Sequence, residues 1–359
     1  MLAERSFDGP QARCKVRGGE SMKQVRVHGP DDVRIDEVEP PHPGPRDAVV
    51  RVAACGICGS DLSYIRRGGL AGPSRTPMPL GHELAGVVEW VGREVAGTAV
   101  GDRVVVHPGN DEIGRIGNGA SEGGLTPSLL VREAARGGRL LRVPESLALD
   151  VAALAEPLAV GMQAAARADV SRGDKVAVFG CGPIGLFALA ALLERGIDQV
   201  VAIDPSARRR ELARELGAQA ALDPDAVDVW AELSRIHGTA PFLLGPTPAT
   251  NAFIEASGAA KVIPDVVARC RAGARLSVVA LHDRPIPTNY TFVMMKQLSI
   301  HGSMEYPARF EDAIELLARR DLSGVVTHRV PLERFDAALA LLRGSKECGK
   351  VLVTMAAGR

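Results

Sequence analysis

The chain has 359 residues, of which 46% are hydrophobic and 4% aromatic, and it carries 43 basic and 43 acidic side chains. This length exceeds the size at which a single hydrophobic core stops growing, so we expect two domains. Balanced charge and scarce aromatic rings exclude an electrostatic or base-stacking reason to expect a nucleic acid or a membrane as partner.

The N-terminal region and the cysteines indicate a cytoplasmic protein. No run of 18 apolar residues occurs. Residues 1–21 lack the apolar stretch of a secretory signal, so we interpret them as a disordered leader or as the product of a start upstream of Met22. The six cysteines are too scattered for a disulfide framework: Cys14, Cys55, Cys58, Cys181, Cys270 and Cys348.

From Met22 to about residue 168 the sequence predicts an irregular, mainly β domain. Short runs with β-branched residues are separated there by segments rich in glycine and proline. The expected strands are Lys23–Val27, Val33–Glu37, Ala48–Ala54, Leu84–Val91 and Arg103–His107.

The pattern then changes to alternating strands and helices, which is typical of a parallel sheet covered on both faces. The expected strands are Lys175–Phe179, Gln199–Ile203, Ala252–Ala256, Arg275–Ala280 and Leu298–His301. The expected helices are Pro183–Arg195, a helix capped by Ser206 that ends at Leu216, and one near Val262–Arg271. The tail, about 302–359, adds helices near Phe310–Arg319 and Glu333–Leu342 and a last strand, Lys350–Thr354.

A dinucleotide loop joins the first of these strands to its helix. The run Gly180-Cys181-Gly182-Pro183-Ile184-Gly185 matches G-x-G-x-x-G, whose glycines let a pyrophosphate approach the helix N-terminus. Asp204 ends the next strand, where it would bind the adenosine ribose and repel a 2′-phosphate, which favours NAD over NADP. The run Arg208-Arg209-Arg210 leaves NADP open, because one of these side chains could meet a 2′-phosphate.

Two other segments supply the side chains of a metal site. Cys58-Gly59-Ser60-Asp61 and Gly81-His82-Glu83 offer a thiolate, an imidazole and a carboxylate that one zinc ion could hold. No four-cysteine cage accompanies them, so the site would be catalytic rather than structural. Because neighbours along a strand point to opposite faces, His82 and Glu83 can reach one ion only if the backbone turns between them.

Taken together, these segments resemble one protein family. Gly56–Asp61, Gly81–Glu83, Glu156-Pro157-Leu158, Gly180–Gly185 and Asp204 follow one another as in the zinc-dependent medium-chain dehydrogenases, particularly the sorbitol, idonate and threonine dehydrogenase branch. The resemblance covers residues 22–359. It implies an α/β protein with a GroES-like catalytic domain, 22–168 and 302–359, and a doubly wound Rossmann domain that binds NAD, 169–301. A homodimer or homotetramer that oxidises a secondary alcohol or polyol to a ketone is expected.

The resemblance also implies roles for individual residues. Cys58 and His82 would bind one catalytic zinc, with Glu83 and Glu156 as alternative or exchanging carboxylates, while Cys55 would be a core residue. Asp61 would orient His82, and Ser60 would be the first hydroxyl of the proton relay. The remaining implied residues are Arg209, Ser257, Val279 and Leu281 at the cofactor and Tyr64, Glu305 and Tyr306 in the substrate pocket.

Three departures from the family pattern qualify these expectations. No cysteine occurs between Val100 and Val143, so we expect one zinc per chain and no structural zinc. Ser63 stands where many relatives have the histidine that ends the relay. Glu305-Tyr306 replaces an Arg-Tyr pair, which puts a sugar alcohol in doubt and leaves an amine-bearing alcohol as an alternative. A zinc-free quinone reductase of this fold and a non-catalytic nucleotide-binding redox sensor are the other functional hypotheses.

Overall fold

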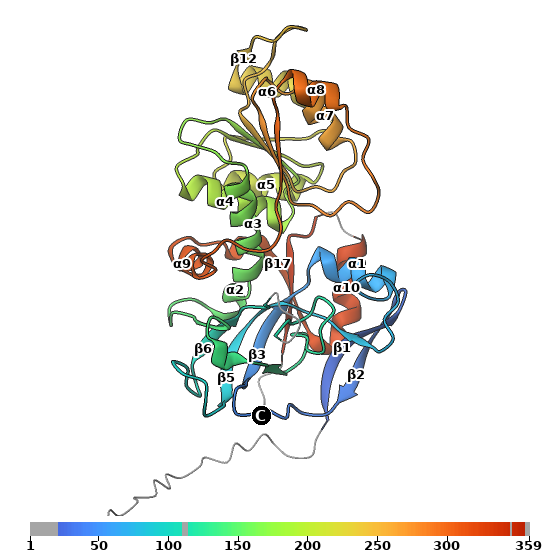
Figure 1. The fold of residues 1–359 in the computed structure, drawn as a ribbon, viewed down its shortest axis with the longest axis vertical. Coiled ribbons are helices and arrows are strands. Elements are labelled where there is room, and N and C mark those ends of the chain that lie inside the picture. Colours follow the sequence, from blue (N-terminus) through green and yellow to red (C-terminus); the bar gives the residue numbers. More distant parts are fainter. Residues whose placement is uncertain (1–20, 110–113, 345–346, 356–359) are drawn as a thin grey trace, which may run out of the picture.

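The structure is a computed structural model that describes residues 21–109, 114–344 and 347–355 (Figure 1). The expected leader, apart from Ser21, lies outside these residues, and so does Cys14. The described chain forms one parallel sheet, in the upper half of Figure 1, and a mainly antiparallel β region below it.

The parallel sheet has the strand order β11-β10-β9-β14-β15-β16. Its strands are β9 (Val176–Phe179), β10 (Val200–Ile203), β11 (Ala220–Leu222), β14 (Ala252–Glu255), β15 (Arg275–Val278) and β16 (Ser299–Gly302). From β9 the chain adds strands first on one side, β10 and β11, and then on the other, from β14 onward. Open sheets of this type bind ligands in the crevice at this switch point between β9 and β14. The predicted α/β fold is thus confirmed. Strand β16 lies at one edge of the sheet.

Helices cover both faces of this sheet: α4 (Pro183–Glu194), α5 (Ala207–Leu216), α6 (Val229–His237), α7 (Val262–Arg269) and α8 (Tyr290–Met295). A short hairpin, β12 (Thr239–Ala240) and β13 (Thr247–Pro248), follows α6. Helix α5 begins where the sequence predicts, because the Ser206 side chain accepts a hydrogen bond from the Arg209 backbone N–H, and it ends at Gly217 in the left-handed region.

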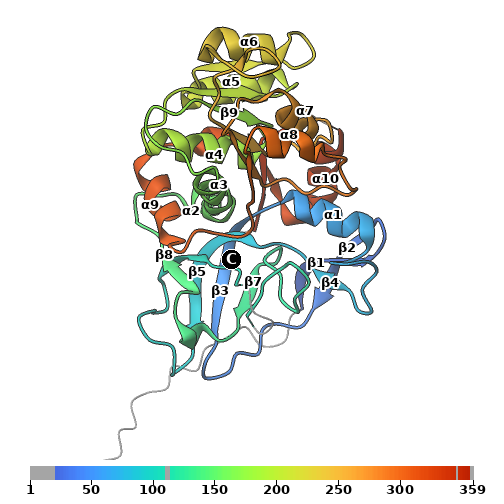
Figure 2. The same cartoon turned by 45° about the horizontal axis from the view of Figure 1, so that its top comes forward.

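Sequence reasoning missed α2 (Leu149–Ala152) and α3 (Ala155–Arg167), which Figures 1 and 2 show running from the lower region up to the parallel sheet (Figure 2). The sequence predicted an irregular, mainly β domain up to residue 168, yet Pro157 lies in the first turn of α3, where proline is tolerated. Gly161 packs so closely on α4 that a Cβ there would collide with Phe187 and Ala188. The stretch Leu149–Arg167 is apolar and long enough to cross a membrane, but it is 61% buried inside the protein, as a core helix is.

The β region combines two sheets. A seven-stranded sheet has the order β17-β18-β3-β5-β6-β8 with β7 added beside β3, and a three-stranded sheet has the order β2-β1-β4. The strands are β1 (Met22–Gly29), β2 (Asp32–Val38), β3 (Ala48–Gly56), β4 (Met78–Pro79), β5 (Glu83–Val91), β6 (Arg103–Val106), β7 (Ser128–Val131), β8 (Leu140–Arg142), β17 (Val326–Pro331) and β18 (Lys350–Thr354). Because β18 pairs with β3, the tail of the chain is built into the sheet formed by its beginning.

Helices α1 (Gly59–Arg67), α9 (Glu311–Arg319) and α10 (Phe335–Gly344) complete the fold, with 3-10 turns at Ala134–Arg136, Ser323–Val325 and Leu332–Arg334. The two tail helices were predicted, whereas α1 was not. Its start is set by Asp61, whose carboxylate accepts a hydrogen bond from the Cys58 backbone N–H at 2.9 Å. This cap holds Cys58 at the helix N-terminus.

Candidate functional site

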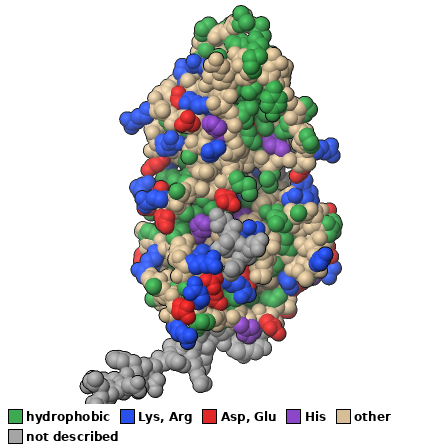
Figure 3. All heavy atoms as spheres, viewed as in Figure 1, with side chains coloured by type: hydrophobic (Ala, Val, Ile, Leu, Met, Phe, Trp, Pro, Cys, Tyr) green, Lys and Arg blue, Asp and Glu red, His purple; other side chains and the backbone are tan. Residues whose placement is uncertain are grey.

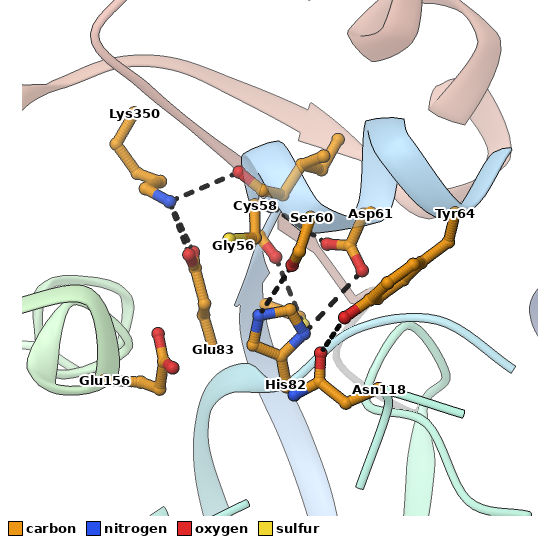
Figure 4. A network of polar contacts seen from close by, with 12 residues as sticks. Gly56, Cys58, Ser60, Asp61, Tyr64, His82, Glu83, Asn118, Glu156 and Lys350 are labelled. Carbon is orange, nitrogen blue, oxygen red and sulfur yellow. Dashed lines mark hydrogen bonds and ion pairs between the residues drawn. The ribbon is translucent and has the colours of Figure 1, made fainter. Parts of the chain in front are cut away.

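Three side chains from separate segments converge beside α1 (Figure 4). One ligand atom of each of Cys58, His82 and Glu83 lies within 4.8 Å of the others. Cys58 precedes α1, His82 lies between β4 and β5, and Glu83 is the first residue of β5. Gly81, with φ +95°, makes the turn that lets two sequence neighbours reach the same point.

Gly56 leaves the space that Glu83 occupies. The two residues are paired in the β3–β5 ladder, and a Cβ at position 56 would collide with the Glu83 carboxylate. The neighbouring Cys55 is fully buried within β3 and takes no part in the group, as expected for a core residue.

A buried lysine, Lys350, pairs with Glu83. Its Nζ lies 2.6 Å from both carboxylate oxygens and also donates to the Ile57 carbonyl oxygen at 3.2 Å. Burial lowers the pKa of Lys350, but the negative charges of Glu83 and Cys58 raise that pKa by more, so the ammonium is the favoured form. Sequence reasoning missed this residue, although a lysine that opens an otherwise apolar strand was a signal.

His82 presents its two ring nitrogens to different partners. Its Nε2 lies 3.5 Å from Ser60 Oγ, and its Nδ1 lies 3.6 Å from Asp61 Oδ1. Burial lowers the pKa of His82, while the Asp61 carboxylate and the Cys58 sulfur raise that pKa, so that it ends well above its usual value.

The donor set fits a zinc ion. His82 Nδ1 and Asp61 Oδ1 are buried and face each other without any hydrogen-bond partner. A metal-bound imidazole needs such a carboxylate behind its second nitrogen. Sulfur, nitrogen and carboxylate oxygen are the ligands that catalytic zinc takes in proteins, with one position left for substrate. The structure therefore groups Cys58, His82 and Glu83 and puts Asp61 behind the imidazole.

Glu156 lies near this group but outside it, at the start of α3. It is buried, and Tyr306 donates a hydrogen bond to its Oε1 at 2.7 Å. Burial, reinforced by the charge of Glu83, raises the pKa of Glu156 to about 7. Tyr306 also packs edge-on against His107, with ring centroids 5.2 Å apart.

The structure leaves Glu305 exposed, with φ +61°. The argument that an acid replacing arginine here disfavours a sugar alcohol assumed a buried, unpaired charge. That assumption does not hold, so Glu305 no longer counts against a polyol.

The glycine-rich loop of residues 114–124 packs against the turn that carries His82. Gly124 N–H donates to the Gly81 carbonyl oxygen at 2.8 Å, and a Cβ at Gly117 would collide with that same carbonyl. Asn118, at the tip of this loop, accepts a hydrogen bond from the Tyr64 hydroxyl at 3.0 Å (Figure 4). Sequence reasoning placed Tyr64 at the pocket but missed Asn118, for which no motif gives a signal.

A second site lies at the switch point of the parallel sheet. A cavity of about 520 Å³ is lined by residues of the dinucleotide loop and its surroundings, among them Gly180, Gly182, Asp204, Arg209 and Ser257. The carboxylate of Asp204 is buried and accepts hydrogen bonds from the backbone N–H groups of Cys181, at 2.7 Å, and Ser206, at 2.8 Å. Gly180 has φ +93° and lies against the Ser257 backbone, where a side chain would not fit.

Four other residues expected at the cofactor do not belong to the lining of this cavity. Pro183 and Ile184 begin α4, whose N-terminus faces the loop. Val279, directly after β15, donates a backbone hydrogen bond to the Glu255 carbonyl oxygen at 3.0 Å. Leu281 is 65% exposed, beyond the end of that strand.

The three consecutive arginines have different partners. Arg208 pairs with Glu211 and Glu215 on the surface of α5. Arg210 pairs with Asp223 at 2.9 Å. Arg209 alone lines the cavity, and its Nε donates to the Cys348 carbonyl oxygen at 2.9 Å. The run is therefore not one anion-binding cluster.

Comparisons with known proteins agree with this geometry. Residues 44–138 match the family model described as alcohol dehydrogenase GroES-like domain, and residues 183–319 match that of a zinc-binding dehydrogenase. Sorbitol dehydrogenase of Rattus norvegicus is 33% identical over 338 residues, which cover 88% of this chain and 91% of that protein.

Two solved structures have the same fold along almost the whole chain. The 2R,3R-butanediol dehydrogenase of Bacillus subtilis is 29% identical with a TM-score of 0.82, over 93% of this chain and 99% of that one. A zinc-binding dehydrogenase of Sinorhizobium meliloti 1021, whose crystal structure holds NADP, is 27% identical with a TM-score of 0.81, over 94% of this chain and all of that one.

Proposed function

The chain belongs to the zinc-dependent medium-chain dehydrogenases, in their polyol branch, and we propose that it oxidises a secondary hydroxyl of a polyol or vicinal diol to a ketone with NAD. The observation that carries this proposal is the convergence of Cys58, His82 and Glu83 within 4.8 Å, in a chain that also has a dinucleotide cavity at its sheet switch point. Sorbitol and butanediol share a secondary alcohol beside a second hydroxyl, which defines the substrate class.

We assign the metal ligands Cys58, His82 and Glu83, with Glu156 as the carboxylate that lies next to them. Zinc bound there would supply a Lewis acid that makes a substrate hydroxyl acidic near neutral pH. Asp61 keeps the His82 imidazole oriented. Lys350 holds the Glu83 carboxylate in place when no metal ion binds that carboxylate. Tyr306 positions Glu156 through its hydroxyl.

Ser60 is the proposed first acceptor of the substrate proton. Its hydroxyl lies 3.5 Å from His82 Nε2, and Cys58 caps its helix, so Ser60 lies next to the ligand group without belonging to it. Ser63 offers no imidazole for the next step, so the proton taken up by Ser60 would leave to water. NAD bound beside this group would supply the hydride acceptor, so loss of the hydroxyl proton and of a hydride from the carbinol carbon would together give the ketone.

NAD is the proposed cofactor because the buried Asp204 carboxylate borders the cavity where the adenosine ribose would lie. A carboxylate there accepts hydrogen bonds from ribose hydroxyls and repels a 2′-phosphate. We assign the loop from Gly180 to Gly185, together with Arg209, Ser257, Val279 and Leu281, to cofactor binding. Tyr64, Asn118 and Tyr306 are the proposed substrate contacts.

The experiment that tests this function is a panel of polyols, vicinal diols, amino alcohols and aryl alcohols, scored for NADH formation at 340 nm before and after zinc removal. We expect turnover of polyols or diols that is lost on chelation and restored by zinc. Turnover of a quinone that survives chelation would refute the proposal. Nucleotide binding without turnover of any alcohol would refute it as well.

We also propose a single zinc per chain. The loop of residues 114–124 packs on the His82 turn through backbone contacts, in the region where relatives with a second zinc carry four cysteines. Metal analysis should give one zinc per chain, and two tightly bound ions would contradict this.

The proposed assembly is a homodimer, or a tetramer built from such dimers, joined along β16. This edge strand and the adjoining α8 expose large apolar side chains, with Ile300 39%, Met294 68% and Tyr290 74% exposed. Figure 3 shows apolar side chains gathered on the upper right, over the region where α8 lies in Figure 1 (Figure 3). Replacing Ile300 by Lys should lower the mass measured by light scattering, whereas replacing the equally apolar Leu243, 82% exposed on the β12–β13 hairpin, should not.

We retain the proposed domain division, a catalytic domain of residues 22–168 and 302–359 and a cofactor domain of residues 169–301, and a cytoplasmic location. Five cysteines in the described chain are free thiols, which supports a reducing compartment.

A further inference from the structure

Glu347 contacts the N-terminus of α5 although it belongs to the segment between α10 and β18. Its Oε2 accepts a hydrogen bond from the Arg208 backbone N–H at 2.9 Å and another from the Ser206 hydroxyl at 3.1 Å. The next residue, Cys348, accepts the hydrogen bond from Arg209 Nε at 2.9 Å. Two consecutive residues thus accept hydrogen bonds from groups at the start of one helix.

This position is the one that a 2′-phosphate would need. The adenosine ribose lies against the last residue of the second strand, here Asp204, and the helix that follows supplies N–H groups and basic side chains to a phosphate on the ribose. Asp204 is fixed by the backbone N–H groups of Cys181 and Ser206, so it stays at the cavity. The nearest donors for a phosphate would be the Ser206 hydroxyl and the Arg208 backbone N–H in the first turn of α5, which here donate to Glu347.

We propose that Glu347 is a second residue that selects NAD against NADP, acting from the other end of the chain. It occupies the donors that would otherwise bind a 2′-phosphate, and it adds a negative charge beside that of Asp204. Cys348 has a supporting effect, because it holds the guanidinium of Arg209, the one arginine of the run that lines the cavity.

The charge, rather than the hydrogen bonds alone, is responsible for the selection in this proposal. A glutamine at position 347 keeps an acceptor oxygen for the same two donors and removes the charge. The substitution should therefore leave the helix cap in place and relieve the repulsion of a phosphate. Glu347 is exposed, so added salt should weaken its repulsion of a phosphate. Dissolved ions screen the interaction between exposed charges over a distance of about 10 Å at 0.1 M salt, and over a shorter distance at higher salt.

This inference rests on the proposed use of NAD, and binding measurements test the two separately. The affinities of NAD⁺, NADP⁺ and the fragments 5′-AMP and 2′,5′-ADP are measured by calorimetry on the unmodified protein, on Glu347→Gln and on Glu333→Gln. Glu333 is the matched control, an exposed acid of the same tail that pairs with Lys23 instead.

We expect Glu347→Gln to bind NADP⁺ and 2′,5′-ADP about fivefold more tightly, with less than a twofold change for NAD⁺ and 5′-AMP, and we expect the difference to shrink in high salt. Glu333→Gln should behave as the unmodified protein. If the unmodified protein prefers NAD⁺ and Glu347→Gln changes nothing, or changes both cofactors equally, Glu347 is only a cap and this inference fails alone. A preference of the unmodified protein for NADP⁺ would overturn the proposed cofactor as well.

Discussion

Replacing Lys350 by Met should destabilise the zinc-free protein and at the same time strengthen zinc binding. The ammonium of Lys350 lies 2.6 Å from both oxygens of Glu83, and both side chains are almost completely buried. Methionine has a similar length but no charge, so the Glu83 carboxylate would remain buried without its counter-charge. A zinc ion is the other cation that can neutralise this carboxylate, which links the two effects.

The size of both effects follows from the burial of the pair. Removing one partner of a buried ion pair costs about 3–5 kcal/mol, because the other charge is left without compensation. If zinc binding recovers about 2 kcal/mol of that cost, the affinity for zinc rises about 30-fold. Urea unfolding followed by circular dichroism, with and without zinc, measures the first effect. Competition with a chelating dye measures the second.

Lys296 provides the matched control, because it is the other fully buried lysine of the described chain. Its Nζ donates to the carbonyl oxygens of Val267 and Ala268 and lies between the rings of Phe242 and Phe292, without an acidic partner. Burial lowers its pKa. Lys296→Met should cost only about 1–2 kcal/mol and leave zinc affinity unchanged. Equal losses of stability in the two variants, together with unchanged zinc affinity in Lys350→Met, would refute the reasoning.

Three further predictions test separate steps. Ser60→Ala should lower turnover by about 10²–10⁴-fold with zinc content unchanged, and undiminished turnover would exclude Ser60 from the proton relay. Gly56→Ala should reduce zinc content, because the added methyl group meets the Glu83 carboxylate, whereas Gly59→Ala, which meets open space, should not; equal zinc content in both would contradict this. Burial lowers the pKa of His237 to about 4, below its unfolded value of 6.5. Between these values the unfolded chain binds the proton more readily, so the free energy of unfolding falls by up to about 3 kcal/mol as the pH drops from 6.5 to 4. Urea unfolding at pH 7 and pH 5 should show a smaller loss in His237→Gln, and an identical loss would remove His237 as the cause.

The sequence predicts best where local pattern and tertiary environment agree. Five strands of the parallel sheet are short apolar runs that were predicted within one or two residues of their bounds, whereas the three-residue edge strand β11 was not predicted. Helix α3 was not predicted. Its Gly161 is required by a close contact with α4, and local propensity does not reveal such tertiary contacts.

The candidate site divides in the same way. Cys58, His82 and Glu83 could be predicted as a set because each lies in a short motif whose residue types suit one metal. Lys350 and Asn118 could not, because each acts through a residue far away in sequence and stands in no motif of its own. Glu305 is a predicted pocket residue that the structure leaves exposed, with φ +61°, so its role stays a prediction.

Three of the residues that sequence reasoning missed, Glu347, Cys348 and Lys350, lie in one short segment. Glu347 and Cys348 bind the start of α5 beside the cofactor cavity, and Lys350 binds Glu83 at the metal ligands. Three residues of extended chain span only about 10 Å, so the segment ties the cofactor side of the cleft to the metal side over a short distance. The pairing of β18 with β3 anchors Lys350 in the sheet. The proposals on Glu347 and Lys350 therefore concern one structural element. If the double variant Glu347→Gln, Lys350→Met changes zinc affinity by more than Lys350→Met alone, the difference measures how strongly the two ends of this segment are coupled.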